Sequence, residues 1–118
     1  MSNNYWLTDL RCVDNQLTTL DLSYNPKLRM LNCAGNQLTS INLQGNTDLK
    51  DISCQENRIT GENMDLLITA LPNVTGGTFM AMSTGSEEQN RMTKAQVAAA
   101  KAKGWTPKYS YGGLIVGE

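Results

Sequence analysis

The sequence has no histidine, almost no net charge and no long apolar run. Without histidine, the chain lacks the commonest general base, the usual Cys-His and Ser-His pairs, and the commonest zinc ligand. Its longest apolar runs are as short as residues 66–68, Leu-Leu-Ile. A membrane-spanning helix needs about 20 apolar residues in a row. We therefore expect no membrane insertion, no metal site and no histidine-based catalysis.

Ten basic and eleven acidic residues give a formal net charge of -1. Nucleic acid and anionic membrane surfaces bind basic faces, so neither partner is expected. Residues 1–4, Met-Ser-Asn-Asn, carry neither the basic nor the apolar part of a signal peptide. If the natural protein is exported, its targeting segment is absent from this chain. The 118 residues are enough for one domain, or are a piece of a larger protein.

Five consecutive segments share the pattern L-x-x-L-x-[LC]-x-x-N, with isoleucine replacing leucine twice. They span residues 7–15, 17–25, 28–36, 38–46 and 49–57. Every second segment repeats the same spacing, from Leu7 to Leu28 to Leu49, so the full unit has a 21-residue period and holds two half-repeats. In each half-repeat the alternation L-x-L or L-x-C points two apolar side chains inward, which predicts a short strand. Equivalent strands are expected to stack side by side as a parallel sheet.

The asparagine of each segment falls where the chain must turn. Its amide is suited to satisfy backbone groups inside the bend, and the aligned Thr18, Thr39 and Thr60 are expected to do the same to a smaller extent.

The three cysteines, Cys12, Cys33 and Cys54, recur with the period of the full unit and share their slot with Leu22 and Leu43. This spacing predicts buried core residues that are neither bridged nor metallated. Zinc ligands converge more closely than this, and side chains on adjacent parallel strands point the same way instead of at each other.

The pattern resembles that of leucine-rich repeats. The version with C-x-x-N-Q-L-T is similar to short-period repeats in surface and secreted proteins of gut Bacteroidetes, and it covers residues 4–60. The resemblance implies an α/β leucine-rich-repeat solenoid of about two and a half 21-residue coils with parallel strands over residues 1–60. It also implies a capping segment of the same domain over residues 61–118, and an exported or cell-surface bacterial location.

The second half carries helix and strand signals in place of the repeat. The order of a strand, a helix and a strand suggests a right-handed crossover that extends the parallel sheet. A capping box of Thr93 and Gln96 starts the second helix, and Pro107 indicates an edge strand. The predicted elements are a helix over 63–71, a strand over 78–82, a polar loop over 83–90, a helix over 93–103, a strand over 105–111 and a loosely held tail over 112–118. Glu87 and Glu88 of the loop are expected to be solvated. In the tail, Leu114, Ile115 and Val116 are the residues able to dock.

No catalytic motif is found, and neither an enzyme nor a cofactor is expected. The best candidate site is the exposed strand face of the cysteine-type half-repeats, because its side chains vary in size and charge from coil to coil. Repeat proteins tend to bind partners on such a face. The candidate residues are Asp9, Arg11, Val13, Met30, Asn32, Asp51, Ser53 and Gln55. We expect a non-enzymatic interaction module that binds a protein or peptide.

Several alternatives stay open. The same face is equally consistent with an ordinary solvated sheet, in a structural spacer or capping fragment of a larger surface protein. Trp105, Tyr109 and Tyr111 suggest a glycan-binding platform, although such residues more often pack a strand. The repeat is already running at residue 4, so the chain is expected to be a fragment, or to self-associate end to end through the strand that contains Leu10 and Cys12.

Overall fold

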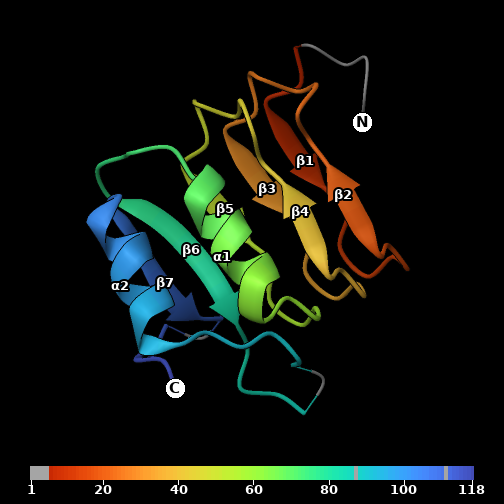
Figure 1. Cartoon of the computed structure of the whole chain (residues 1–118). Helices are drawn as coiled ribbons and strands as arrows, with labels where there is room; N and C mark the ends of the chain where they lie inside the picture. Colours follow the sequence, from red (N-terminus) through yellow and green to blue (C-terminus); the bar gives the residue numbers. More distant parts are fainter. Residues whose placement is uncertain (1–5, 87, 111) are drawn as a thin grey trace.

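Two parallel sheets and two helices make up an α/β fold in the computed structural model, which describes residues 6–86, 88–110 and 112–118 (Figure 1). The larger sheet has five strands in the order β1-β3-β5-β6-β7, and the smaller one pairs β2 with β4. The elements are β1 (Asp9–Arg11), β2 (Thr19–Asp21), β3 (Met30–Asn32), β4 (Ser40–Asn42), β5 (Asp51–Ser53), α1 (Gly61–Ala70), β6 (Gly77–Met82), α2 (Lys94–Ala102) and β7 (Trp105–Tyr109). The predicted α/β class and parallel strands are confirmed.

The 21-residue interval sets the strand register. Leu10 lies beside Leu31 and Leu31 beside Ile52 in the larger sheet, and Leu20 lies beside Ile41 in the smaller sheet. The chain therefore passes alternately through the two sheets, and the central side chain of each short strand turns into the core between them.

The asparagines satisfy the backbone inside the bends, as predicted. The Asn57 Nδ2 atom donates to the carbonyls of Cys33 and Cys54, both at 3.0 Å, and its Oδ1 accepts from the Leu38 N–H at 2.9 Å. Asn57 thus joins its own segment, residues 49–57, to the two segments before it. These three backbone groups are buried and would be costly to leave unpaired. Thr39 contributes a longer bond of 3.4 Å to the Thr18 carbonyl.

After β5 the chain continues the larger sheet instead of the smaller one. β6 pairs with β5, and β7 pairs with β6 and lies at the sheet edge, as Pro107 predicted. The capping box of Thr93 and Gln96 is present at the start of α2. In Figure 1 both helices lie in front of the larger sheet, α1 beside β4 and α2 beside α1. The first helix begins two residues earlier than predicted, at Gly61, and the last strand ends at Tyr109; Tyr111 lies outside the described residues.

The expectation of a loosely held tail is wrong for part of residues 112–118. Ile115 is buried, and its N–H donates to the Pro107 carbonyl at 3.1 Å. Leu114 forms an antiparallel bridge with Lys108, although its side chain is exposed. The tail docks because its backbone pairs along the free edge of β7.

The expectation that Glu88 is solvated is wrong, and Ser83 and Asn90 of the same polar loop are buried as well. Glu87 lies outside the described residues. The Asn90 Nδ2 atom donates to the Cys54 and Ala81 carbonyls at 2.7 and 2.9 Å. Its Oδ1 accepts from the Ile59 N–H at 2.7 Å, so Asn90 repeats the bonding of Asn57 one strand further along the sheet.

Candidate functional site

The side of the larger sheet that faces away from the core forms one continuous surface, which we call the open face. Along each strand the residues alternate, so that Leu31, Ile52 and Phe79 are buried while their neighbours in sequence point outward. None of the outward residues is fully buried. The open face consists of Asp9, Arg11, Met30, Asn32, Asp51, Ser53, Thr78, Met80, Thr106 and Lys108.

These residues form two rows across the five strands. The first row is Asp9, Met30, Asp51, Thr78 and Thr106, and the second is Arg11, Asn32, Ser53, Met80 and Lys108. Neighbouring strands lie about 4.8 Å apart, so each row spans roughly 20 Å. That is long enough to contact several residues of an extended peptide or an edge of a folded partner.

The structure brings the predicted site residues together. Six of them lie in register on β1, β3 and β5. Val13 and Gln55 follow the ends of β1 and β5, where the register continues because the Asp14 N–H donates to the Ala34 carbonyl at 3.0 Å. Val13 is 40% exposed, whereas Ala34 between them is buried. The Oε1 atom of Gln55 is buried and has no hydrogen-bond partner within the described residues.

Sequence reasoning missed the part of the open face that β6 and β7 supply. Thr78, Met80, Thr106 and Lys108 continue the two rows without a gap. The alternation T-F-M-A-M over residues 78–82 was the available signal for the first two residues. Nothing in the sequence aligns them with β5, because β6 follows β5 at a longer interval than that of the repeat.

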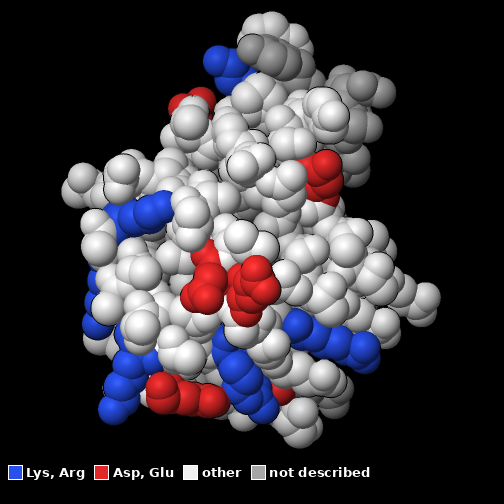
Figure 2. All heavy atoms as spheres, in the orientation of Figure 1, with Lys and Arg blue, Asp and Glu red and all other residues white. Residues whose placement is uncertain are grey.

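The charges on and around the open face are of both signs. Asp9 and Asp51 lie in the first row, and Arg11 and Lys108 lie at the two ends of the second row. Beside the first row is a hollow of about 510 Å³, lined by Asp9, Arg29, Met30, Asp48, Lys50 and Asp51. Figure 2 shows the opposite, helical side of the molecule, where acidic and basic side chains are likewise interspersed without a large patch of one sign.

No protein-family model, curated protein or solved structure matches this chain. Its function is therefore inferred from its own residues and their geometry. None of its described helices is long and apolar enough to cross a membrane.

The cysteines lie beneath the open face and are all free. Cys33 and Cys54 are buried as predicted, but Cys12 is only partly buried, because among the described strands β1 has a neighbour on one side only. Burial raises the pKa of the Cys54 thiol to about 12, and the Glu88 carboxylate adds to that rise. Burial also raises the pKa of Cys33 well above its usual value. Across residues 6–86, 88–110 and 112–118, no cluster of metal-ligating side chains was found.

Trp105 packs into the core, as such strand residues more often do, and does not contribute to the glycan platform that the sequence leaves open as an alternative. Trp105 is 1% exposed and points into the core, where its indole N–H donates to the Pro72 carbonyl at 2.9 Å. Tyr109 is half-buried against the core, and Tyr111 lies outside the described residues. Because Trp105 cannot present its ring to a sugar, the three aromatic residues do not share an exposed surface.

Proposed function

We propose that this chain is a non-enzymatic interaction module of the leucine-rich-repeat type, which binds a protein or peptide through the open face. The proposal follows the solenoid reading of the sequence, with residues 1–60 as repeat coils and residues 61–118 as a cap. Its resemblance to Bacteroidetes surface and secreted proteins favours an exported or cell-surface location.

The observation that carries the proposal is the continuity of the open face. Ten outward side chains occupy matching positions on five parallel strands, and the register runs from β1 to β7. Helices and the smaller sheet cover the other side, so the open face is the broad sheet surface left to a partner. Met30 and Met80 are half-buried there, and methionine adapts readily to the shape of a bound surface.

The experiment starts from peptides selected by display on the immobilised protein. The affinity of a selected peptide is then compared between the unchanged protein, Asn32→Lys and Asn42→Lys. These two asparagines are closely matched, since each accepts a hydrogen bond from the N–H two residues later, at 3.3 and 3.0 Å. Asn32 lies on the open face and Asn42 lies on β4.

We expect Asn32→Lys to weaken binding by about tenfold or more, because interface centres hold the residues that matter most to affinity. Asn42→Lys should change the affinity little for a peptide that binds the open face. Selected peptides that depend on Asn42 and not on Asn32 would place recognition elsewhere. Met30→Ala should leave stability within about 0.5 kcal/mol, so that any loss of binding is not a loss of folding.

A second candidate function is a structural cap or spacer in a larger surface protein. The observation that favours it is the bonding of Glu88 and Asn90, whose side chains take up backbone groups that a further repeat would otherwise pair. If this is the function, the chain fused to further repeat coils should have a higher free energy of unfolding than the chain alone. Display on the immobilised protein should then yield no peptide that binds the open face.

A further inference from the structure

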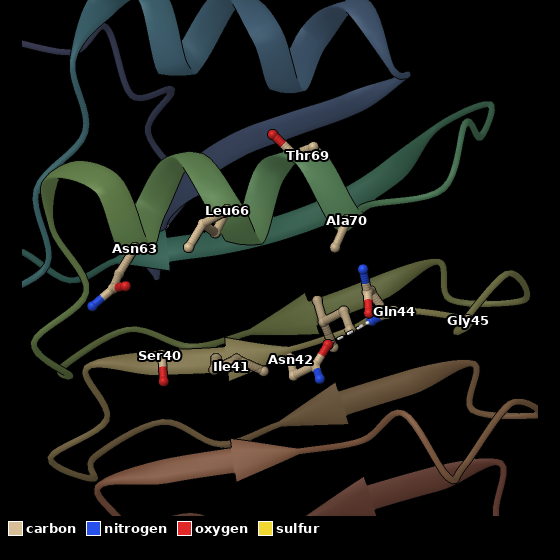
Figure 3. A pocket seen from close by; sticks show the side chains of 10 residues that line it. Ser40, Ile41, Asn42, Gln44, Gly45, Asn63, Leu66, Thr69 and Ala70 are labelled. Carbon is tan, nitrogen blue, oxygen red and sulfur yellow. Dashed lines mark hydrogen bonds between the residues drawn. The ribbon is translucent and has the colours of Figure 1, made fainter.

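A groove lies between β4 and α1, on the opposite side of the molecule from the open face. It has a volume of about 450 Å³, within the usual range for ligand sites. Figure 3 shows side chains from the helix and the strand converging on it. Its lining residues are Ser40, Ile41, Asn42, Leu43, Gln44, Gly45, Asn63, Leu66, Thr69 and Ala70.

The groove occupies the place where a third strand of the smaller sheet would lie. Residues 17–25 supply β2 and residues 38–46 supply β4, one full repeat later. The next segment begins the same way, since Ile59 is buried like Leu38. The chain then turns into α1 at Gly61, so the third strand is replaced by a helix that leaves the edge of β4 without a strand partner among the described strands.

The free edge of β4 carries backbone hydrogen-bonding groups. The Leu22 N–H donates to the Asn42 carbonyl at 3.0 Å, so the Asn42 carbonyl points to β2. Alternate residues of a parallel strand direct their backbone groups to opposite edges. The N–H and C=O of Ile41 therefore point away from β2 and toward the groove, and an extended segment is what such an edge pairs with.

Leu66 adds an apolar contact that the core does not explain. The core-facing residues of α1 are Met64, Leu67 and Ile68, whereas Leu66 is 59% exposed. Figure 3 places its side chain in the groove, on the side toward Ile41. An occupant that pairs with β4 would cover this leucine.

The lining of the groove also restricts the charge of the occupant. None of its ten lining residues is acidic or basic. A charged side chain buried there would lose hydration without gaining a partner, which is unfavourable. The segment that already lies beside the groove, residues 38–45 (LTSINLQG), is itself uncharged, and its apolar residues Ile41 and Leu43 alternate with polar ones.

We propose that this groove binds an uncharged extended peptide segment, which adds to the edge of β4 as a third strand and places an apolar side chain on Leu66. The site is separate from the open face, and it stands whether or not the open face binds a partner.

The test uses the peptide of residues 38–45 as the probe, with an uncharged fluorescent dye (BODIPY) on its N-terminal amine and an amidated C-terminus, so that neither end carries a charge. Fluorescence anisotropy should show saturable binding below about 1 mM, the weak end of specific recognition. The same peptide with Ile41→Asp should bind at least about tenfold more weakly. Amide exchange at Ile41 and Leu43 of the protein should slow when the peptide is added.

Two protein variants localise the binding. Leu66→Asp should weaken it by about tenfold, whereas Leu114→Asp, at a leucine that is 60% exposed outside the groove, should not. Asn63→Lys, at an exposed lining residue whose side chain points toward β4 in Figure 3, serves as a second groove variant if Leu66→Asp disturbs the helix. Absence of saturable binding, equal binding of the Ile41→Asp peptide, or exchange changes confined to the open face would overturn the proposal. Protection of Ile41 that rises with protein concentration alone would also overturn it, because the occupant would then be a second copy.

Discussion

The Oε2 atom of Glu88 accepts a hydrogen bond from the Glu56 backbone N–H at 2.7 Å. In the two earlier cysteine-type segments the equivalent N–H groups belong to Asp14 and Gly35. Each of them donates to a backbone carbonyl of the next cysteine-type segment instead. The carboxylate of Glu88 therefore stands where a backbone carbonyl would stand if the 21-residue winding continued. It also accepts from the N–H groups of Ser83 and Asn90 at 2.6 and 2.7 Å.

Glu88→Gln should lower the free energy of unfolding by about 1–3 kcal/mol, because the glutamine amide nitrogen has no lone pair to offer an N–H and leaves at least one buried donor unpaired. Urea unfolding checks this. The matched control is Asp48→Asn at an exposed site, which should shift stability by no more than about 0.5 kcal/mol. Equal effects of the two substitutions would mean that the carboxylate does not hold these backbone groups.

Asn57→Ala should be strongly destabilising, whereas Asn15→Ala should not. Asn57 is buried and bonds four backbone groups, three of them buried, and each buried group left unpaired costs about 1–3 kcal/mol. Asn15 occupies the same slot in the first segment but is exposed, and water can replace its bonds. Thermal or urea unfolding of the two variants tests the difference. Similar losses at both sites would contradict the role assigned to the buried asparagines.

Thiol labelling should separate the three cysteines. Cys33 and Cys54 are fully buried, and burial raises the pKa of both thiols, so neither should react in the native protein at neutral pH. Cys12 is partly exposed and should react slowly. Mass spectrometry over a time course of iodoacetamide treatment should find one site labelled gradually in the native protein, and three sites after denaturation. Prompt native labelling of Cys33 or Cys54 would be the opposite result.

Stability should fall at alkaline pH through the buried thiols. The pKa of Cys54 is raised from 9.0 to about 12 in the folded protein, so between those values the unfolded chain releases a proton that the folded chain retains. The contribution is present below pH 9 and declines above it, by up to about 1.4 kcal/mol per pH unit for each such thiol. Urea unfolding from pH 8 to about pH 10.5 measures the slope.

Cys54→Ala is the control for this pH dependence. The variant loses packing at every pH, so the comparison is between slopes and not between absolute stabilities. The slope should be shallower in Cys54→Ala than in the unchanged protein. Identical slopes would assign the alkaline loss to other groups.

The repeat made the first half of the fold predictable, because each slot has one physical role. The 21-residue interval sets the register of β1, β3 and β5, and alternation decides which side chains form the open face. Cys12 departs from the rule of its slot because β1 is the edge strand of the larger sheet in the part of the chain that the structure describes. The pattern describes an interior segment and cannot report this end effect.

The second half was less predictable because its alignment with the repeat does not use a fixed interval. Asn90 repeats the bonding of Asn57. The 21-residue repeat would place the equivalent residue at Thr78, but Asn90 lies well past it, beyond an inserted loop. Glu88 is predicted to be solvated because a carboxylate in a polar loop usually is. Only the tertiary structure brings three backbone N–H groups to it. The groove beside β4 is likewise invisible in the sequence, since it arises where α1 replaces a strand.

Amide chemical shifts of the protein with a display-selected peptide test most directly whether the open face is the binding surface. We predict that the largest chemical-shift changes fall on the outward residues of β3, β5 and β6, including Asn32, Ser53 and Met80. The shifts of α2 should not change. These residues lie at the centre of the open face, where a partner that spans its two rows must make contact. Changes confined to α1 and α2, with β3, β5 and β6 unperturbed at saturation, would contradict the assignment of the open face as the binding surface.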